Sequence, residues 1–196
     1  MNQEKIVIWF KKWASIVNEE KVYISDLDNA IGDGDHGFNM SKGLTAWLEA
    51  RENKVTESIT DEFKLLGMTL LSKVGGAAGP LYGSAFMAMA KLTGDKTELS
   101  RDEIIELLEA GINSIKLRGK ATLGEKTMVD LWIPAIERLK EGTLTPSVVD
   151  ELVEATIPLK ATKGRASYLG ERSIGHIDPG SYSSGIMFKK LLEVLN

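Results

Sequence analysis

The segment SRDEIIELLEAGINSIKLRG, from Ser100 to Gly119, decides the fold class of this chain. Ser100 and Glu103 form the S-x-x-E pattern of a capping box, which predicts a helix start. Apolar residues then recur every three or four positions, as on the buried face of a helix. Basic side chains occupy the last turn, and Gly119 stands where the helix should end. We therefore expect one amphipathic helix here.

The same helical spacing continues on both sides of this segment. It recurs in residues 6–17, 40–48, 63–74, 131–139, 149–153 and 187–195. Thr145 followed by Pro146 is typical of a helix start, and that helix is expected to reach a kink at Pro158. Val22 to Ile24 is the only strand-like stretch, and neither period-two alternation nor an internal repeat is sustained. The pattern predicts an all-α fold of about eight helices.

Composition limits the class of protein. The 196 residues are 43% hydrophobic and 27% charged, as expected for one globular domain spanning 1–196. The net charge of −4 argues against a nucleic-acid or anionic-membrane surface. The absence of cysteine excludes disulfides and thiolate chemistry and suits a cytoplasmic location. The longest uncharged run, Val74 to Ala90, is broken by four glycines and Pro80, so no membrane span is expected.

An acidic stretch, DLDNAIGDGDHGFNM from Asp26 to Met40, is the first candidate site. It places aspartates at positions 26, 28, 33 and 35. Carboxylates this close repel one another, so a bound cation is expected to offset them. Mg²⁺ and Ca²⁺ prefer such oxygen ligands. A solvated acidic turn remains the alternative on composition alone.

The common cation and phosphate motifs do not fit this stretch. EF-hand registers that begin at Asp26 or Asp33 lack glycine at the sixth position. Gly32, Gly34 and Gly37 match G-x-G-x-x-G, but no strand is expected before them. A Walker A sequence is absent. The remaining possibility for nucleotide binding is that aspartates hold Mg²⁺ and the Mg²⁺ ions hold the phosphates.

Four segments, in matching order and spacing, closely resemble the nucleotide-binding L subunits of bacterial dihydroxyacetone kinases. They are GDGDHGFNMSKG (32–43), GMTLLSKVGGAAGPLYG (67–83), RGKATLGEKTMVDLW (118–132) and KGRASYLGERSIGHIDPG (163–180). The resemblance covers essentially the whole chain. It implies eight antiparallel amphipathic helices in a closed barrel, with a nucleotide site in the loops at one end.

The resemblance also implies a set of ligands. Two Mg²⁺ ions would be held by Asp28, Asp33 and Asp35. The residues implied to contact ADP or ATP are His36, Gly37, Phe38, Asn39, Ala77, Ala78, Gly119, Met128, Arg165, Ile177, Asp178 and Pro179.

Several of these residues have a plain physical interpretation and an alternative. Small residues at 75–79 permit close approach of a ligand, or simply tight helix packing, and Pro80 is expected to start the next helix. Met128 could cover the adenine face or be an ordinary core residue. Arg165 could neutralise charge on a transferring phosphoryl group, as the candidate catalytic residue, or lie in a solvated basic loop. Asp178 is expected to cap the last helix.

The function implied by the resemblance is phosphoryl transfer by a subunit that carries the nucleotide. A phosphohistidine protein of the phosphotransferase system would phosphorylate bound ADP in place. The phosphoryl group would then pass to dihydroxyacetone held on a separate K subunit, and the chain would be active only with these partners. Two alternatives stay open: a nucleotide sensor that docks on a transcription factor, and a kinase that exchanges ATP and acts on another small molecule.

Overall fold

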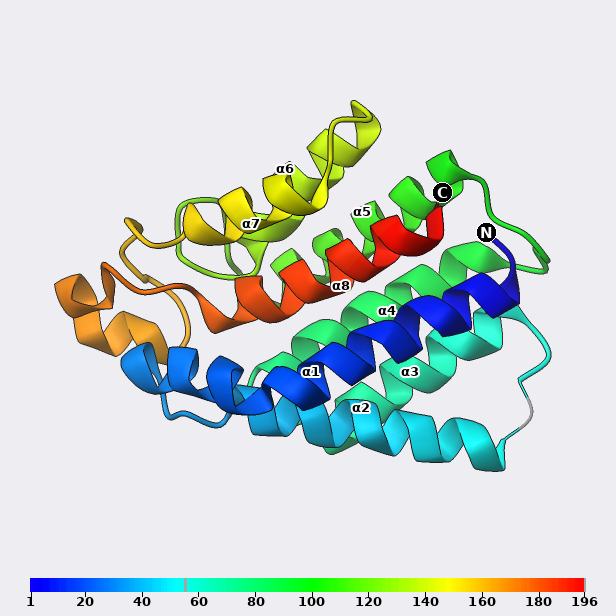
Figure 1. Ribbon diagram of the computed structural model, residues 1–196, viewed down its shortest axis with the longest axis horizontal. Coiled ribbons are helices and arrows are strands. Elements are labelled where there is room, and N and C mark those ends of the chain that lie inside the picture. Colours follow the sequence, from blue (N-terminus) through cyan, green and yellow to red (C-terminus); the bar gives the residue numbers. More distant parts are fainter. Residues whose placement is uncertain (55, 196) are drawn as a thin grey trace.

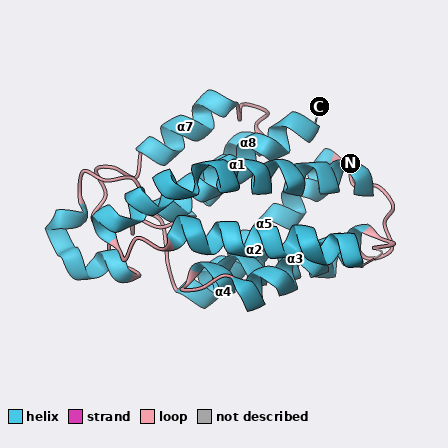
Figure 2. Cartoon of the chain, turned by 60° about the horizontal axis from the view of Figure 1, so that its bottom comes forward, coloured by secondary structure: helices cyan, strands magenta, loops and turns pink. Residues whose placement is uncertain are grey.

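The computed structural model describes residues 1–54 and 56–195, and every regular element there is a helix (Figures 1 and 2). The elements are α1 (Gln3–Ile31), α2 (His36–Asn53), α3 (Ile59–Lys73), α4 (Ala78–Thr93), α5 (Arg101–Gly119), α6 (Val129–Lys140), α7 (Pro146–Glu154), the 3₁₀ helix η1 (Arg165–Ser173) and α8 (Pro179–Leu195). Eight α-helices confirm the expected all-α fold. None of the described helices is long and apolar enough to cross a membrane.

The helices form a closed antiparallel ring. Each α-helix packs against the next one along the chain, and α1 also packs against α8, which closes the ring. The N- and C-termini lie at the same end of the molecule (Figure 1). We call this the terminal end. Helices α1, α3, α5 and α7 begin there, and α2, α4, α6 and α8 begin at the opposite end, which we call the pocket end.

Large aromatic side chains fill the inside of the ring. Phe10 packs edge-to-face against Phe63 and Phe86, with ring centroids 5.3 and 5.4 Å apart. The indole N–H groups of Trp9 and Trp13 donate to backbone carbonyls of α8 at 2.9 and 3.1 Å. Burial of these rings contributes to the packing energy, and the two indole hydrogen bonds fix α1 against α8.

The terminal end shows the two helix starts predicted at Ser100 and Thr145, and two further capped starts. Ser100 and Glu103 form the capping box of α5, and Thr145 caps α7 with Pro146 as its first residue. Asn2 and Ser58 cap α1 and α3 in the same way. Each side-chain oxygen accepts a backbone N–H that would otherwise lack a partner.

Two local predictions were wrong. Val22 to Ile24 lies inside α1, because a three-residue stretch carries no period and Ile24 falls on the buried face. Pro158 does not kink α7, which ends four residues earlier at Glu154. Helix α5 ends at Gly119 as expected, but the left-handed residue after it is Lys120.

Two boundaries at the pocket end also differ from the expected ones. Helix α1 runs to Ile31, so Asp28 belongs to its last turn and the acidic loop shrinks to four residues. Helix α4 begins at Ala78, two residues before Pro80. Proline has no backbone N–H and fits the first turn generally, so its presence does not specify the first residue.

Candidate functional site

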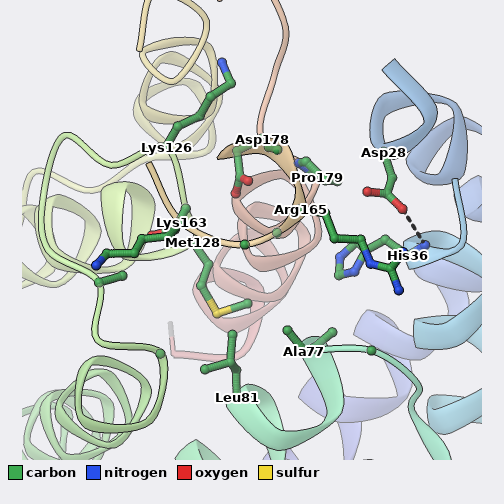
Figure 3. Close-up of a pocket in the computed structure, with 18 of the residues that line it drawn as sticks. Asp28, His36, Ala77, Leu81, Lys126, Met128, Lys163, Arg165, Asp178 and Pro179 are labelled. Carbon is green, nitrogen blue, oxygen red and sulfur yellow. Dashed lines mark hydrogen bonds between the residues drawn. The ribbon is translucent and has the colours of Figure 1, made fainter. Parts of the chain in front are cut away.

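The loops of the pocket end surround a cavity of about 400 Å³ (Figure 3). Its walls include the first residues of α2, α4, α6 and α8 and the last turns of α1 and α5. Four helix N-termini therefore meet at one cavity. Because each N-terminus carries a partial positive charge, the cavity favours an anionic ligand although the chain is acidic overall.

The acidic cluster lies on one wall of this cavity. Asp28 is buried, and its Oδ2 accepts the backbone N–H groups of Asp35 and His36 at 2.9 and 3.1 Å (Figure 3). One carboxylate oxygen from each of Asp28, Asp33 and Asp35 lies within 4.8 Å of the others. Three hard oxygen ligands at this spacing fit a divalent cation such as Mg²⁺.

Gly32 explains how the chain turns so tightly around Asp28. A Cβ atom at this position would overlap Oδ1 of the Asp28 carboxylate. Gly34 has a φ of +75°, a left-handed conformation that residues other than glycine rarely adopt. The two glycines thus allow the short loop to bring Asp33 and Asp35 beside the end of α1.

Arg165 faces the same cluster from η1. Its guanidinium forms an ion pair with Asp33, with 2.8 Å between Nη1 and Oδ2. The arginine side chain is 66% exposed, so the pair is readily exchanged for other partners. A phosphate bound at the cluster would offer Arg165 a more highly charged partner than one carboxylate.

The start of α4 lies on the same cavity and is built from small residues. In the part of the chain that the structure describes, Ala77 forms no side-chain cap on this helix. Gly76 has a φ of +64°, and a Cβ atom at Gly79 would overlap the Val74 carbonyl. Tight packing therefore explains Gly79, while Ala77 and Ala78 line the cavity.

The opposite wall is more apolar and contains one buried carboxyl. Met128 and Leu81 line it together with Asp178 (Figure 3), and Ile115 also lines the cavity. Oδ2 of Asp178 accepts the N–H of Ser181 at 2.6 Å, so Asp178 caps α8 as predicted. Burial raises the pKa of the Asp178 carboxyl to about 6. This wall suits a flat, weakly polar group more than a phosphate.

His36 is held inside the bundle. Its Nε2 lies 2.9 Å from the hydroxyl of Ser183, which in turn bonds the hydroxyl of Tyr82 at 2.8 Å. Burial lowers the pKa of the imidazole, and the charges of Asp28 and Asp35 oppose that shift. The imidazole thus ties the start of α2 to α8.

The cavity brings together most of the residues singled out in the sequence. Those lining it are Asp28, Asp33, Asp35, His36, Asn39, Ala77, Ala78, Gly119, Met128, Arg165, Asp178 and Pro179. Three others are not among its lining residues. Gly37 packs against the Lys21 carbonyl, Phe38 is 50% exposed, and Ile177 packs against the core.

Sequence reasoning missed several lining residues, of which Lys126 is the most unusual. It is only 1% exposed, and its φ of +59° is rare for a residue with a side chain. Its sequence neighbours gave no sign of burial, because a lysine in a polar loop is normally solvated. Ile115 was predicted only as part of the apolar stripe of the helix that begins at Ser100, and Leu81 was not singled out.

The fold and cavity together define an all-helical protein with an oxygen-ligand cluster facing helix N-termini. Residues 30–193 match the model of the DAK2 domain, Dak2. The chain therefore belongs to the DAK2 domain family.

Named relatives agree with this assignment. The chain is 50% identical, over 94% of its length and 93% of the relative's, to the PEP-dependent dihydroxyacetone kinase 1, ADP-binding subunit DhaL, of Listeria innocua. It is 49% identical, over 95% of both chains, to the PTS-dependent dihydroxyacetone kinase, ADP-binding subunit DhaL, of Lactococcus lactis. The dihydroxyacetone kinase of C. freundii, solved in complex with AMP-PNP and Mg²⁺, shares the fold. Its TM-score is 0.73 at 23% identity, over 94% of this chain and 33% of that one.

Proposed function

We propose that this chain is the ADP-binding subunit of a dihydroxyacetone kinase. The observation that carries the proposal is the cluster of Asp28, Asp33 and Asp35, which shares one cavity with four helix N-termini. The names of the relatives support the same nucleotide and substrate. We also propose that residues 1–196 form one nucleotide-binding domain and that the protein is cytoplasmic.

The proposed ligand set places two Mg²⁺ ions on the three aspartates. Bound Mg²⁺ would bridge and neutralise phosphate oxygens at the cluster. Asp28 is fixed for this role because its Oδ2 accepts two backbone N–H groups. The start of α4 adds backbone N–H groups for a phosphate, and Arg165 adds a mobile cation.

The base of the nucleotide would occupy the apolar wall. Met128 is nearly fully buried and packs beside Gly180, where a Cβ atom would lie 3.5 Å from the methionine side chain. A polarizable thioether on the face of adenine adds contact area without requiring a hydrogen bond. The cavity would thus hold the phosphates at its charged end, beside the aspartates, and the base at its apolar end, beside Met128.

The proposed reaction needs two partners. A phosphohistidine protein of the phosphotransferase system would phosphorylate ADP without its release, and a K subunit would hold dihydroxyacetone as acceptor. This chain would then supply positioning and charge neutralisation, which is what phosphoryl transfer chiefly requires of a protein. The exposed position of the cluster and of Arg165 at one end of the ring leaves the phosphates accessible to such partners.

The first test is to identify what the protein carries. The protein is purified without added nucleotide and denatured, and the released small molecules are identified and counted, for the wild type and for Asp33→Ala. We expect near-stoichiometric ADP from the wild type and little from the variant. Glu109→Gln, which removes a surface ion pair with Lys140, is the matched control and should retain ADP.

The second test adds the partners. With the phosphohistidine protein and K subunit of a relative, bound ADP should support dihydroxyacetone phosphorylation without exchange with free nucleotide. Rapid exchange with free ATP would instead favour an ordinary ATP-dependent kinase. Retention of ADP without any transfer, together with binding to a transcription factor, would favour a sensor.

A further inference from the structure

Lys126 lies in the loop between α5 and α6, two residues before Met128. Lys126 is among the residues that line the cavity, and its side chain extends toward the backbone that follows α7 (Figure 3). The ammonium therefore does not face a ligand. A buried lysine at this place needs another explanation, because burying a charge is costly unless its hydrogen bonds are satisfied.

The ammonium is satisfied by three backbone carbonyls. Nζ donates to the carbonyls of Thr156 at 2.7 Å and Ile157 at 3.3 Å, and also to that of His176. Lysine has three N–H donors, so this set uses all of them. Burial lowers the pKa of Lys126, while the carboxylates of Asp178 and Asp130 oppose that shift.

These three carbonyls belong to two segments of the chain. The α5–α6 loop must pack against both segments to form the apolar wall. Thr156 and Ile157 follow α7, and His176 precedes α8 by three residues. A second contact supports the same junction, since the hydroxyl of Ser181 donates to the carbonyl of Thr127 at 3.0 Å. Lys126 thus joins the α5–α6 loop, the end of α7 and the approach to α8.

We propose that Lys126 is a positioning residue for the base end of the nucleotide cavity. By holding the three segments together, its ammonium keeps Met128 and Asp178 at the wall where the base would lie. The acidic cluster is built on the last turn of α1 and the loop that joins α1 to α2, so it does not depend on these contacts of Lys126. This inference rests on the proposed binding of ADP.

The test separates the two ends of the ligand. Nucleotide-free wild type and Lys126→Met are titrated calorimetrically with ADP and with pyrophosphate, both in the presence of Mg²⁺. Lys126→Met should weaken ADP binding by about tenfold or more, as loss of a supporting residue commonly does. Pyrophosphate binding should stay unchanged, because it uses only the cluster end.

Chemical rescue tests the ammonium itself. The natural chain has no cysteine, so Lys126→Cys introduces a single thiol. The denatured variant is alkylated with 2-bromoethylamine: the Cys thiolate attacks the carbon that carries bromine, bromide leaves, and an aminoethyl group is attached to sulfur. The product is then refolded. ADP affinity should return toward the wild-type value. Alkylation with iodoacetamide, which attaches a neutral amide, should not restore it, and Lys140→Cys treated with either reagent should bind like the wild type.

Several results would overturn the proposal. These are wild-type ADP affinity in Lys126→Met, equal losses of ADP and pyrophosphate binding, or equal rescue by both alkylating reagents. Should Lys126→Met not fold, Lys126→Gln keeps two N–H donors without the charge and must show the same selective loss of ADP. Failure of the wild type to bind either ligand would refute the proposed function instead.

Discussion

The two ends of the helical ring start their helices differently. At the terminal end, α1, α3, α5 and α7 each begin with a side-chain cap, from Asn2, Ser58, Ser100 and Thr145. At the pocket end, and within residues 1–54 and 56–195, α2, α4 and α6 begin without a side-chain cap from their own N-cap residue. Only α8 resembles the terminal end there, through Asp178.

The difference indicates how the molecule divides stability from binding. A capped helix start satisfies its own N–H groups and has little left for a ligand. In α2 and α6 some of these N–H groups are taken by side chains outside the N-cap position: His36 and Phe38 donate to Asp28 and Ser25, and Val129 donates to Thr127. Within the described residues, the start of α4 has no side-chain cap, which leaves N–H groups and partial positive charge available there, at some cost in stability. The terminal end therefore holds the fold together, and the pocket end carries the groups that a phosphate ligand requires. The predictions below test this division.

The largest expected effect is loss of binding at the pocket end without loss of stability. Asp35→Asn preserves shape but removes one charge from the acidic cluster. We expect Mg²⁺-dependent ADP affinity to fall about 100-fold, equivalent to about 2.7 kcal/mol. The urea midpoint should barely move, since the position stands at an exposed loop and helix start. Calorimetry measures the ADP affinity, and urea titration measures the unfolding midpoint. Unchanged ADP affinity would show that Asp35 does not contribute to binding Mg²⁺ and ADP.

Asp178 should make the pocket end less stable at neutral pH. Its folded-state pKa of about 6 lies above the ordinary value of 3.8, so ionisation is disfavoured in the folded protein. Its contribution to stability therefore falls as pH rises from about 4 to about 6. Asp178→Asn keeps an oxygen to cap Ser181 and should be more stable than the wild type by about 1–2 kcal/mol at pH 7. The gain should shrink toward zero as pH approaches 4.

Glu103 at the terminal end provides the control, because its pKa is shifted in the opposite direction to that of Asp178. A hydrogen bond from Lys96, then one from the Ser100 backbone, lowers the pKa of its carboxyl to about 2. Its stabilising contribution is present above the unfolded-state pKa of about 4.5 and is lost as pH falls toward 2. Glu103→Gln should therefore lower stability at pH 7, with a difference that disappears in acid. Urea midpoints across pH for both variants decide whether the two signs differ.

A new negative charge at the uncapped start of α4 should stabilise the helix and harm binding. Ala77→Asp would interact favourably with the helix dipole while repelling phosphate. We expect about a tenfold loss of ADP affinity, equivalent to about 1.4 kcal/mol, with stability unchanged or slightly higher. Ala77→Asn has nearly the same size without the charge and should lose less. Equal losses in the two variants would point to steric exclusion rather than charge.

The smallest effect should follow removal of a cap at the terminal end. Ser100→Ala deletes the oxygen that accepts the Glu103 N–H, and should cost about 1 kcal/mol of unfolding free energy. ADP affinity should be unchanged, because α5 begins at the end of the ring away from the cavity. A loss of ADP affinity in this variant would show that the two ends are coupled.

The same contrast explains what could be predicted from the sequence. Caps such as Ser100 with Glu103 and Thr145 with Pro146 are local signals, so the terminal end and the helix count were predictable. The helical position of Asp28 was not predicted. Helix propensity near a helix end is weak, and packing extends α1 to Ile31. The aspartates nevertheless stood out, since their mutual repulsion depends only on their closeness in the chain.

Other parts of the site depend on tertiary contacts and could not be seen in advance. The burial of Lys126 requires three carbonyls from distant segments. Phe38 points to solvent although it lies between His36 and Asn39, because its position falls on the outer face of α2. The ion pair of Arg165 with Asp33 joins residues 132 positions apart (165 − 33).

The most direct test of the central claim is a calorimetric titration of the nucleotide-free wild-type protein with ADP, with Mg²⁺ and with EDTA in its place. Saturable binding of one ADP per chain with Mg²⁺, and its loss in EDTA, is the result we predict. Equal binding in both conditions, or none in either, would contradict a nucleotide site built on Asp28, Asp33 and Asp35.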